Sequence, residues 1–151
     1  MDFSKIINLN AVDIGYHARD KADVLEHMSN MLYASGAITS TEDFMADVYL
    51  REGEGMTGIG DGIAIPHGKS SCVKRSCVAI CSLSNSIQWE SIDDTPVKLV
   101  FLFAVVKEAA EAVHLKMMAN IASALADEKN CALLKEVQTP QEFVALFDSF
   151  L

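Results

Sequence analysis

The chain has 151 residues, of which 50% are hydrophobic and 22% are charged. This length and composition predict one globular domain, residues 1–151, that can bury a core without disulfides or a structural metal. The formal net charge is -9, and the Lys and Arg residues are scattered. A polyphosphate backbone would be repelled by such a chain, so nucleic acid is not expected as a partner.

The four cysteines are expected to be reduced and buried, since they form no C-x-x-C pair and stand at no metal-finger spacing from a histidine. They are Cys72, Cys77, Cys81 and Cys131. The first residues lack the basic and long apolar regions of a signal peptide. The longest apolar run, residues 99–106, is far shorter than the ~20 residues of a membrane helix. We therefore expect a cytoplasmic protein without direct membrane insertion.

Hydrophobic patterns predict a strand and two helices in the first third of the chain. Residues 11–16 alternate loosely, as a strand does. Asp20 can then cap the first helix. Two overlapping capping boxes in residues 39–43 can open the second helix, whose end carries Arg51 and Glu52.

The rest of the chain predicts buried strands followed by helices. Strands are predicted at residues 63–65, 77–83 and 97–106, with a small one at 87–89. Helices are predicted at residues 108–126 and 130–137, and after the capping residue Thr139. The two long apolar runs are typical of interior strands covered on both faces. Helices on either side of buried strands predict an α/β layer fold.

A glycine-rich segment is the most unusual part of the sequence. Five of the eight glycines lie in residues 53–62, shortly before His67. Residues 53–58 match the glycine pattern of a dinucleotide fingerprint, but they follow a predicted helix, whereas that fingerprint follows a strand. Residues 62–70 resemble a P-loop, but the spacing of their glycines is wrong for that motif. What remains is a loop whose backbone N–H groups can face an anion. Thr57 adds a hydroxyl donor, and Arg51 adds a charge that suits phosphate oxygens.

His67 is the candidate nucleophile. A neutral imidazole nitrogen can attack phosphorus, and the loop with Arg51 could stabilise the charge without a nucleotide or an obligatory metal. We therefore expect no cofactor. A lone histidine is more often a surface or core residue, but the adjoining loop and arginine favour a functional role. His17 and His27 have no motif or charge partner beside them and are expected to be structural or exposed.

The segment around His67 resembles the active-site signature of a known family. The matching residues are Arg51-Glu52, Thr57-Gly-Ile-Gly60 and Gly62-Ile-Ala-Ile-Pro-His67-Gly, with a later helix His114-Leu-x-x-Met-Ala-x-Ile. They resemble the type-2 enzyme IIA family, the fructose and mannitol class, of the bacterial phosphoenolpyruvate-dependent sugar phosphotransferase system. The likeness extends over nearly the whole chain.

The resemblance implies a phosphotransferase that works through a phosphohistidine. His67 would accept a phosphoryl group from the carrier HPr and donate it to a cysteine of enzyme IIB, for uptake of a fructose-like or mannitol-like sugar. Arg51 and His114 would help hold the phosphohistidine. By its residues alone, His114 borders an apolar stripe and would be a core histidine. The implied fold is a mixed β-sheet flanked by helices on both faces.

The remaining candidate residues have supporting roles. Thr57, Gly58 and Gly60 are expected in a phosphate-binding loop, and Glu52 either steers Arg51 or is solvated. Around His67 we expect an exposed apolar rim where partner proteins dock, with acidic residues further out. Two alternative functions stay open: a regulatory binding module like the nitrogen-related branch of the family, and a nucleotide-binding or metal-dependent enzyme.

Overall fold

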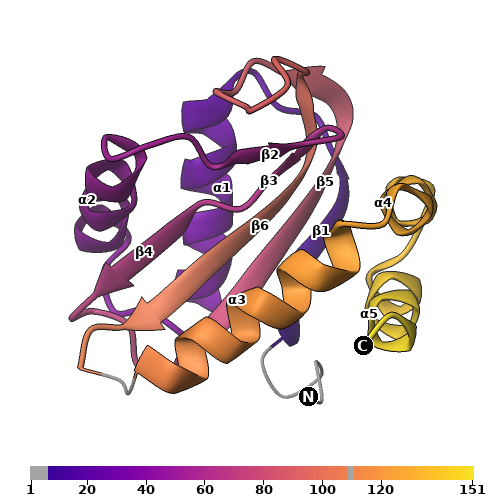
Figure 1. Ribbon diagram of the computed structural model, residues 1–151. Coiled ribbons are helices and arrows are strands. Elements are labelled where there is room, and N and C mark those ends of the chain that lie inside the picture. Colours follow the sequence, from indigo (N-terminus) through magenta and orange to yellow (C-terminus); the bar gives the residue numbers. More distant parts are fainter. Residues whose placement is uncertain (1–6, 109–110) are drawn as a thin grey trace.

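The protein is a mixed β-sheet with helices packed on both of its faces (Figure 1). The computed structural model describes residues 7–108 and 111–151, apart from the side chains of residues 8 and 111–114. The strands in this part of the chain are β1 (Ile7–Tyr16), β2 (Gly58–Gly60), β3 (Ile63–Ala64), β4 (His67–Ser70), β5 (Cys77–Ile87) and β6 (Val97–Val106). The helices are α1 (Lys21–Ala34), α2 (Thr41–Glu52), α3 (Glu111–Leu125), α4 (Glu128–Lys135) and α5 (Pro140–Ser149). The predicted α/β class is confirmed.

The sheet is built around the antiparallel pair of β5 and β6. Strand β1 runs parallel to β5 on one side, while β3 and β4 both run parallel to β6 on the other. Strand β3 pairs with the first part of β6 and β4 with its last part, so the two form one interrupted strand. The interruption falls at Ile65 and Pro66, because proline has no N–H to donate to the ladder. His67 is the first residue after it.

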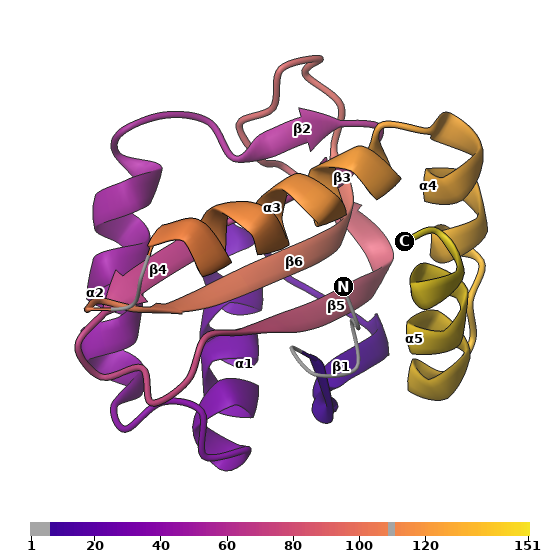
Figure 2. The same ribbon diagram turned by 60° about the horizontal axis from the view of Figure 1, so that its bottom comes forward.

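Two hydrophobic layers follow from the alternation of side chains along the central strands. In β5, Ala79 and Cys81 pack in the layer beneath α1 and α2, whereas Val78 and Ile80 pack in the opposite layer. That second layer receives the apolar faces of α3, α4 and α5. Figure 2 shows α1 and α3 on opposite sides of the sheet. The strand period of two residues thus divides the core between the two faces.

The predicted helix signals agree with the observed caps. The Asp20 side chain accepts a hydrogen bond from the N–H of Asp23. Of the two overlapping capping boxes, the one at Ser40 is used, and its side chain accepts from the N–H of Asp43. Helix α2 ends at Glu52, where the sequence places it. Local chemistry therefore sets these helix starts, because each cap satisfies an otherwise unpaired backbone donor.

The strands differ more from the prediction. The first strand begins at Ile7, four residues before the predicted start, and β5 continues to Ile87 and absorbs part of the small strand predicted at 87–89. Strands β2 and β4 are not predicted at all, because the glycine-rich and polar sequences that form them have no hydrophobic alternation. Part of the predicted helix 108–126, residues 109 and 110, lies outside the described residues.

The four cysteines are buried free thiols, as predicted. No helix in the described part of the chain has both the length and the apolar character needed to cross a membrane.

Candidate active site

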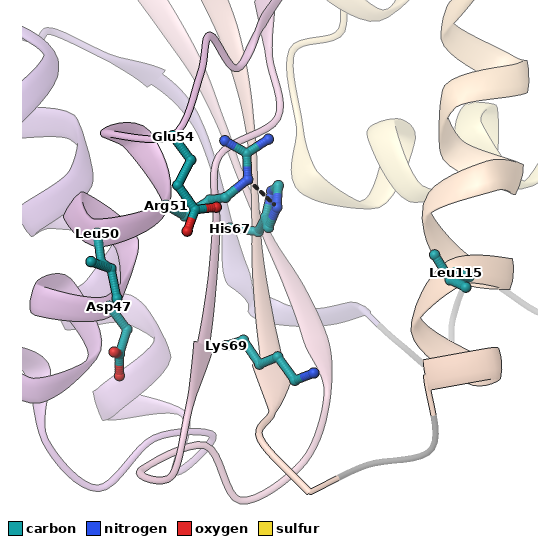
Figure 3. Close-up of a pocket in the computed structure, with 7 residues that line it drawn as sticks. All are labelled: Asp47, Leu50, Arg51, Glu54, His67, Lys69 and Leu115. Atoms are coloured by element: carbon teal, nitrogen blue, oxygen red, sulfur yellow. Dashed lines mark hydrogen bonds between the residues drawn. The ribbon is translucent and has the colours of Figure 1, made fainter.

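An open pocket of about 410 Å³ contains His67 and Arg51. Its lining residues come from the end of α2 and the turn after it, from β4, and from α3 (Figure 3). They are Asp47, Leu50, Arg51, Glu54, His67, Lys69 and Leu115. Segments far apart in the sequence therefore meet around one histidine.

The hydrogen bonds of His67 define its tautomer. Arg51 Nε donates to His67 Nε2 at 3.0 Å, which is the bond drawn in Figure 3. On the other side of the ring, His67 Nδ1 lies 3.2 Å from the carbonyl oxygen of Ile65. A guanidinium N–H can only donate and a carbonyl oxygen can only accept. Nδ1 therefore carries the proton, and Nε2 presents its lone pair on the side of Arg51.

The surroundings of His67 favour this neutral form. Burial is the largest influence and lowers the pKa of the imidazole below its ordinary value of 6.5, and the charge of Arg51 lowers it further. The hydrogen bond to Ile65 and the carboxylates of Glu52 and Glu54 act in the opposite direction, but the net shift is downward. The ring is thus held neutral and nucleophilic over a wider pH range than a solvated histidine.

Arg51 is oriented by the turn that follows α2. Its Nη1 donates to the carbonyl oxygen of Gly55 at 3.3 Å, while its Nε donates to His67. A guanidinium has five N–H donors, so the two bonds with described residues leave further donors for phosphoryl oxygens. Arg51 can therefore hold an anion next to the Nε2 atom that it contacts.

Close packing of α2 against β4 brings Arg51 to His67. Gly68 allows this approach, because a Cβ atom at that position would lie 2.8 Å from Phe44 Cε1 and 2.8 Å from Val48 Cγ2. Both side chains belong to the buried face of α2. The glycine next to the histidine therefore determines how near the helix can come.

A polar network, buried at Thr57 and Trp89 and exposed at Glu90, fixes the end of α2 beside the glycine-rich segment. The Thr57 hydroxyl donates to Glu52 Oε1 at 2.7 Å and accepts a bond from Trp89 Nε1 at 3.0 Å. Lys21 lies 3.3 Å from Glu52 Oε2 and 2.6 Å from Glu90 Oε2. Its ammonium group also sits 4.9 Å from the centre of the Trp89 ring. The Glu52 side chain is only 7% exposed, so these partners replace water around its charge.

The structure places the predicted phosphate-binding residues away from the lining of the His67 pocket. The Thr57 hydroxyl is engaged within the buried network, and the N–H of Gly58 donates to the carbonyl oxygen of Glu90 at 3.1 Å. Gly60 has a φ of +94° beside the turn between β2 and β3, a conformation that favours glycine. In this conformation the hydrogen bonds of Thr57 and Gly58 stabilise the loop.

His114 belongs to α3, but its side chain lies outside the described residues. Its predicted role therefore remains a prediction. The next residue, Leu115, lines the pocket across from Arg51 (Figure 3).

Several residues of the site escape the sequence prediction. Lys21 and Trp89 are separated from Glu52 by more than thirty positions along the chain, so no local pattern connects them to it. Leu50 and Leu115 give a weak signal, since each is a large apolar residue outside the buried stripe of its helix. They are 68% and 63% exposed, which agrees with the apolar rim expected around His67.

These features define a class: an α/β protein that presents a neutral, arginine-bound histidine in an open pocket. Residues 5–150 match the family described as "Phosphoenolpyruvate-dependent sugar phosphotransferase system, EIIA 2". The chain belongs to this family, which confirms the resemblance seen in the sequence and supports a phosphocarrier role.

Relatives of two kinds are similar to this chain. A 2-O-alpha-mannosyl-D-glycerate-specific EIIABC component of Escherichia coli (strain K12) is 32% identical over 149 residues, which cover 98% of this chain. The chain spans only 23% of the length of that relative. A nitrogen regulatory protein of Klebsiella oxytoca is 32% identical over 143 residues, which cover 94% of this chain and 87% of the relative.

A solved structure of a nitrogen-regulatory protein is also similar to this chain. The nitrogen regulatory protein IIA-Ntr from Neisseria meningitidis superposes with a TM-score of 0.89 at 26% identity. The match covers 95% of this chain and 97% of that one. Sugar-specific and nitrogen-regulatory proteins are thus both similar to this chain.

Proposed function

We propose that residues 1–151 form a single cytoplasmic enzyme IIA domain that carries a phosphoryl group on His67. The group would come from phospho-HPr and pass to a cysteine of enzyme IIB during uptake of a fructose-like or mannitol-like sugar. Family membership supports the phosphocarrier role, and the pocket supports the choice of residue. The observation that carries the proposal is the contact between Arg51 Nε and a neutral His67.

The tautomer points to Nε2 as the attacking atom. Its lone pair would form the new N–P bond while the bond between phosphorus and the donor breaks, and the donor keeps that electron pair. Because Arg51 Nε donates to the same lone pair in the resting state, the guanidinium must first turn toward the phosphoryl oxygens. There it would stabilise the charge of the transition state. The Nδ1 proton would stay on the bond to Ile65, which keeps the ring oriented.

Transfer to enzyme IIB would reverse this step. A cysteine thiolate would attack the phosphorus, the N–P bond would break, and His67 would return to its neutral form with the lone pair on Nε2. Arg51 would stabilise this transition state as it did the first. The same two residues then serve both half-reactions.

A labelling experiment tests this proposal. The protein is incubated with phosphoenolpyruvate, enzyme I and HPr, and the phosphohistidine is followed by phosphorus NMR. We expect one phosphoryl group per chain, with no label on His67→Gln and normal labelling of the control His17→Gln, which lies outside the pocket. Label that persists in His67→Gln would reject His67 as the acceptor.

A regulatory function is the second candidate, favoured by the nitrogen-regulatory relatives of similar identity. In that case the phosphorylation of His67 would set the affinity for another protein instead of feeding sugar uptake. Genes for enzyme IIB and IIC next to the gene for this chain would favour transport. Rapid transfer of the label from His67 to a cysteine of such an enzyme IIB would support transport directly, whereas a label that stays on the chain would favour regulation.

A further inference from the structure

We propose that Asp13, His27 and Cys81 form a binding site for one Zn²⁺ ion, separate from the pocket at His67. The three side chains come from three different elements, β1, α1 and β5. One potential ligand atom from each residue lies within 4.8 Å of the other two. This is the one such cluster of three metal-binding side chains in the described part of the chain.

The sheet register brings two of the ligands together. Asp13 of β1 and Cys81 of β5 are direct partners in the parallel pairing of these strands, so their side chains leave the same face of the sheet. Helix α1, which carries His27, covers that face (Figures 1 and 2). Sites built on paired strands and a packed helix hold their geometry better than sites on loops.

The ligand set suits zinc. Thiolate, imidazole and carboxylate bind Zn²⁺ at roughly 2.0–2.3 Å in tetrahedral sites, which places ligand atoms about 3.5 Å apart. Asp13 Oδ2 and His27 Nε2 are now 2.7 Å apart and would separate slightly to admit the ion. A water molecule would complete the tetrahedron. With Cys81 and Asp13 ionised and His27 neutral, the two negative charges would balance the charge of the ion.

Neighbouring groups hold the imidazole in place. The rings of Tyr16 and His27 are stacked, with centroids 3.8 Å apart and planes 2° from parallel. The Tyr16 hydroxyl donates to Asp23 Oδ1 at 3.0 Å. The stacked Tyr16 ring, itself tied to Asp23, limits rotation of the imidazole. The sequence predicts no charge partner for His27, but the structure supplies Asp13.

The ion has a route to the site from solvent. The Cys81 side chain is buried, while the side chains of His27 and Asp13 remain 28% and 36% exposed. Zn²⁺ would therefore enter past these two residues and meet the sulfur at the base of the site. Binding would release the thiol proton of Cys81 to solvent, since the thiolate is the ligand.

Metal titrations test the proposal on the untagged protein after dialysis against a chelator. Calorimetry should show one equivalent of Zn²⁺ bound, and Co²⁺ in its place should give a thiolate-to-metal charge-transfer band in the near ultraviolet. Cys81→Ala should abolish the band and weaken Zn²⁺ binding by at least about 100-fold, beyond the usual loss of an outer partner. The matched control is Cys77→Ala, another buried cysteine of β5 in the same layer of the core.

A second pair of variants covers the case in which Cys81→Ala does not fold. His27→Gln changes a partly exposed position and should also weaken binding about 100-fold, while His17→Gln should leave it unchanged. The absence of the charge-transfer band in the wild-type protein, or its persistence in folded Cys81→Ala, would overturn the proposal and leave Asp13 and His27 as an ion pair. Because binding is measured directly, a protein in which His67 proves inactive in phosphoryl transfer would still give a clear answer.

Discussion

The imidazole of His67 combines burial with a defined proton position, and this combination predicts a pH profile. In the proposed mechanism the neutral ring is the nucleophile, and its pKa is lowered below 6.5 by burial and by Arg51. The rate of phosphoryl acceptance should therefore decline as Nε2 becomes protonated, with a midpoint below pH 6.5. Initial labelling rates against pH, with the donor enzymes in excess, would measure the midpoint, and a midpoint above 6.5 would contradict the structure.

The same titration can be followed without catalysis. In Arg51→Gln the positive charge beside the ring is lost, so the pKa of His67 should move upward, toward its ordinary value. NMR titration of the imidazole signals would show this. The same pKa shift makes the stability depend on pH, because a histidine whose pKa is lowered in the folded protein binds fewer protons there than in the unfolded chain. His67 therefore reduces the free energy of unfolding as the pH falls below 6.5, and His67→Gln should lose that contribution.

The hydrogen bonds of Thr57 lead to a further prediction, which concerns the stability of the protein. Its hydroxyl donates to the buried carboxylate of Glu52 and accepts from Trp89, so Thr57→Val would leave both partners short of a hydrogen bond. The free energy of unfolding should fall by about 1–3 kcal/mol, measured by urea denaturation. Thr57→Ser keeps the hydroxyl and should lose much less. Equal stabilities of the two variants would show that the hydroxyl contributes little.

At the level of elements, the packing of α2 on β4 sets the distance between Arg51 and His67. Gly68 makes this contact possible, and Gly68→Ala would place a methyl group against buried Phe44 and Val48. We expect a loss of about 1–3 kcal/mol in the free energy of unfolding, as for other overpacked cores. The helix should also move away from β4, which would lengthen the contact from Arg51 to His67 and slow labelling.

A glycine at a position with open space provides the control for this prediction. Gly55 lies in the turn after α2, where an added Cβ would meet nothing within 4 Å. Gly55→Ala should therefore leave both the stability and the labelling rate nearly unchanged. If Gly68→Ala behaves in the same way, α2 is not held as closely to β4 as the structure indicates.

At the scale of the whole molecule, the pocket lies open beside an exposed apolar rim formed by Leu50 and Leu115. Met56, which is 57% exposed, is a further exposed apolar side chain on the turn that follows α2. Such residues are typical of sites where another protein docks. Acidic Asp47 and Glu54 line the same pocket and could contribute to the choice of partner through their charge.

This rim gives a prediction for the proposed reaction with HPr. The double variant Leu50→Ser, Leu115→Ser should raise the KM for phospho-HPr several-fold and leave the melting temperature close to that of the wild type, because both side chains are exposed. Steady-state kinetics and thermal denaturation would measure the two effects. Leu133→Ser changes an exposed leucine of α4 outside the pocket and should alter neither quantity. An unchanged KM in the double variant would place the docking surface elsewhere.

The helix starts, the interior strands and the family signature of this protein can be predicted from local sequence alone. The caps at Asp20 and Ser40 are set by a side chain and a backbone N–H three residues apart. The interior strands follow from apolar runs long enough to be buried on both faces. The segment that ends at His67 also carries the family signature, because its glycines, arginine and histidine are close together in the chain.

Only the tertiary structure decided how those residues work. The tautomer of His67 depends on the Ile65 carbonyl and on the approach of α2, which Gly68 permits. The structure also showed that Thr57, which the sequence places in a phosphate-binding loop, bonds to Glu52 and Trp89, and it showed Asp13 beside His27. These contacts connect strands and helices that are distant in sequence. Packing determines such contacts, and no local propensity encodes them.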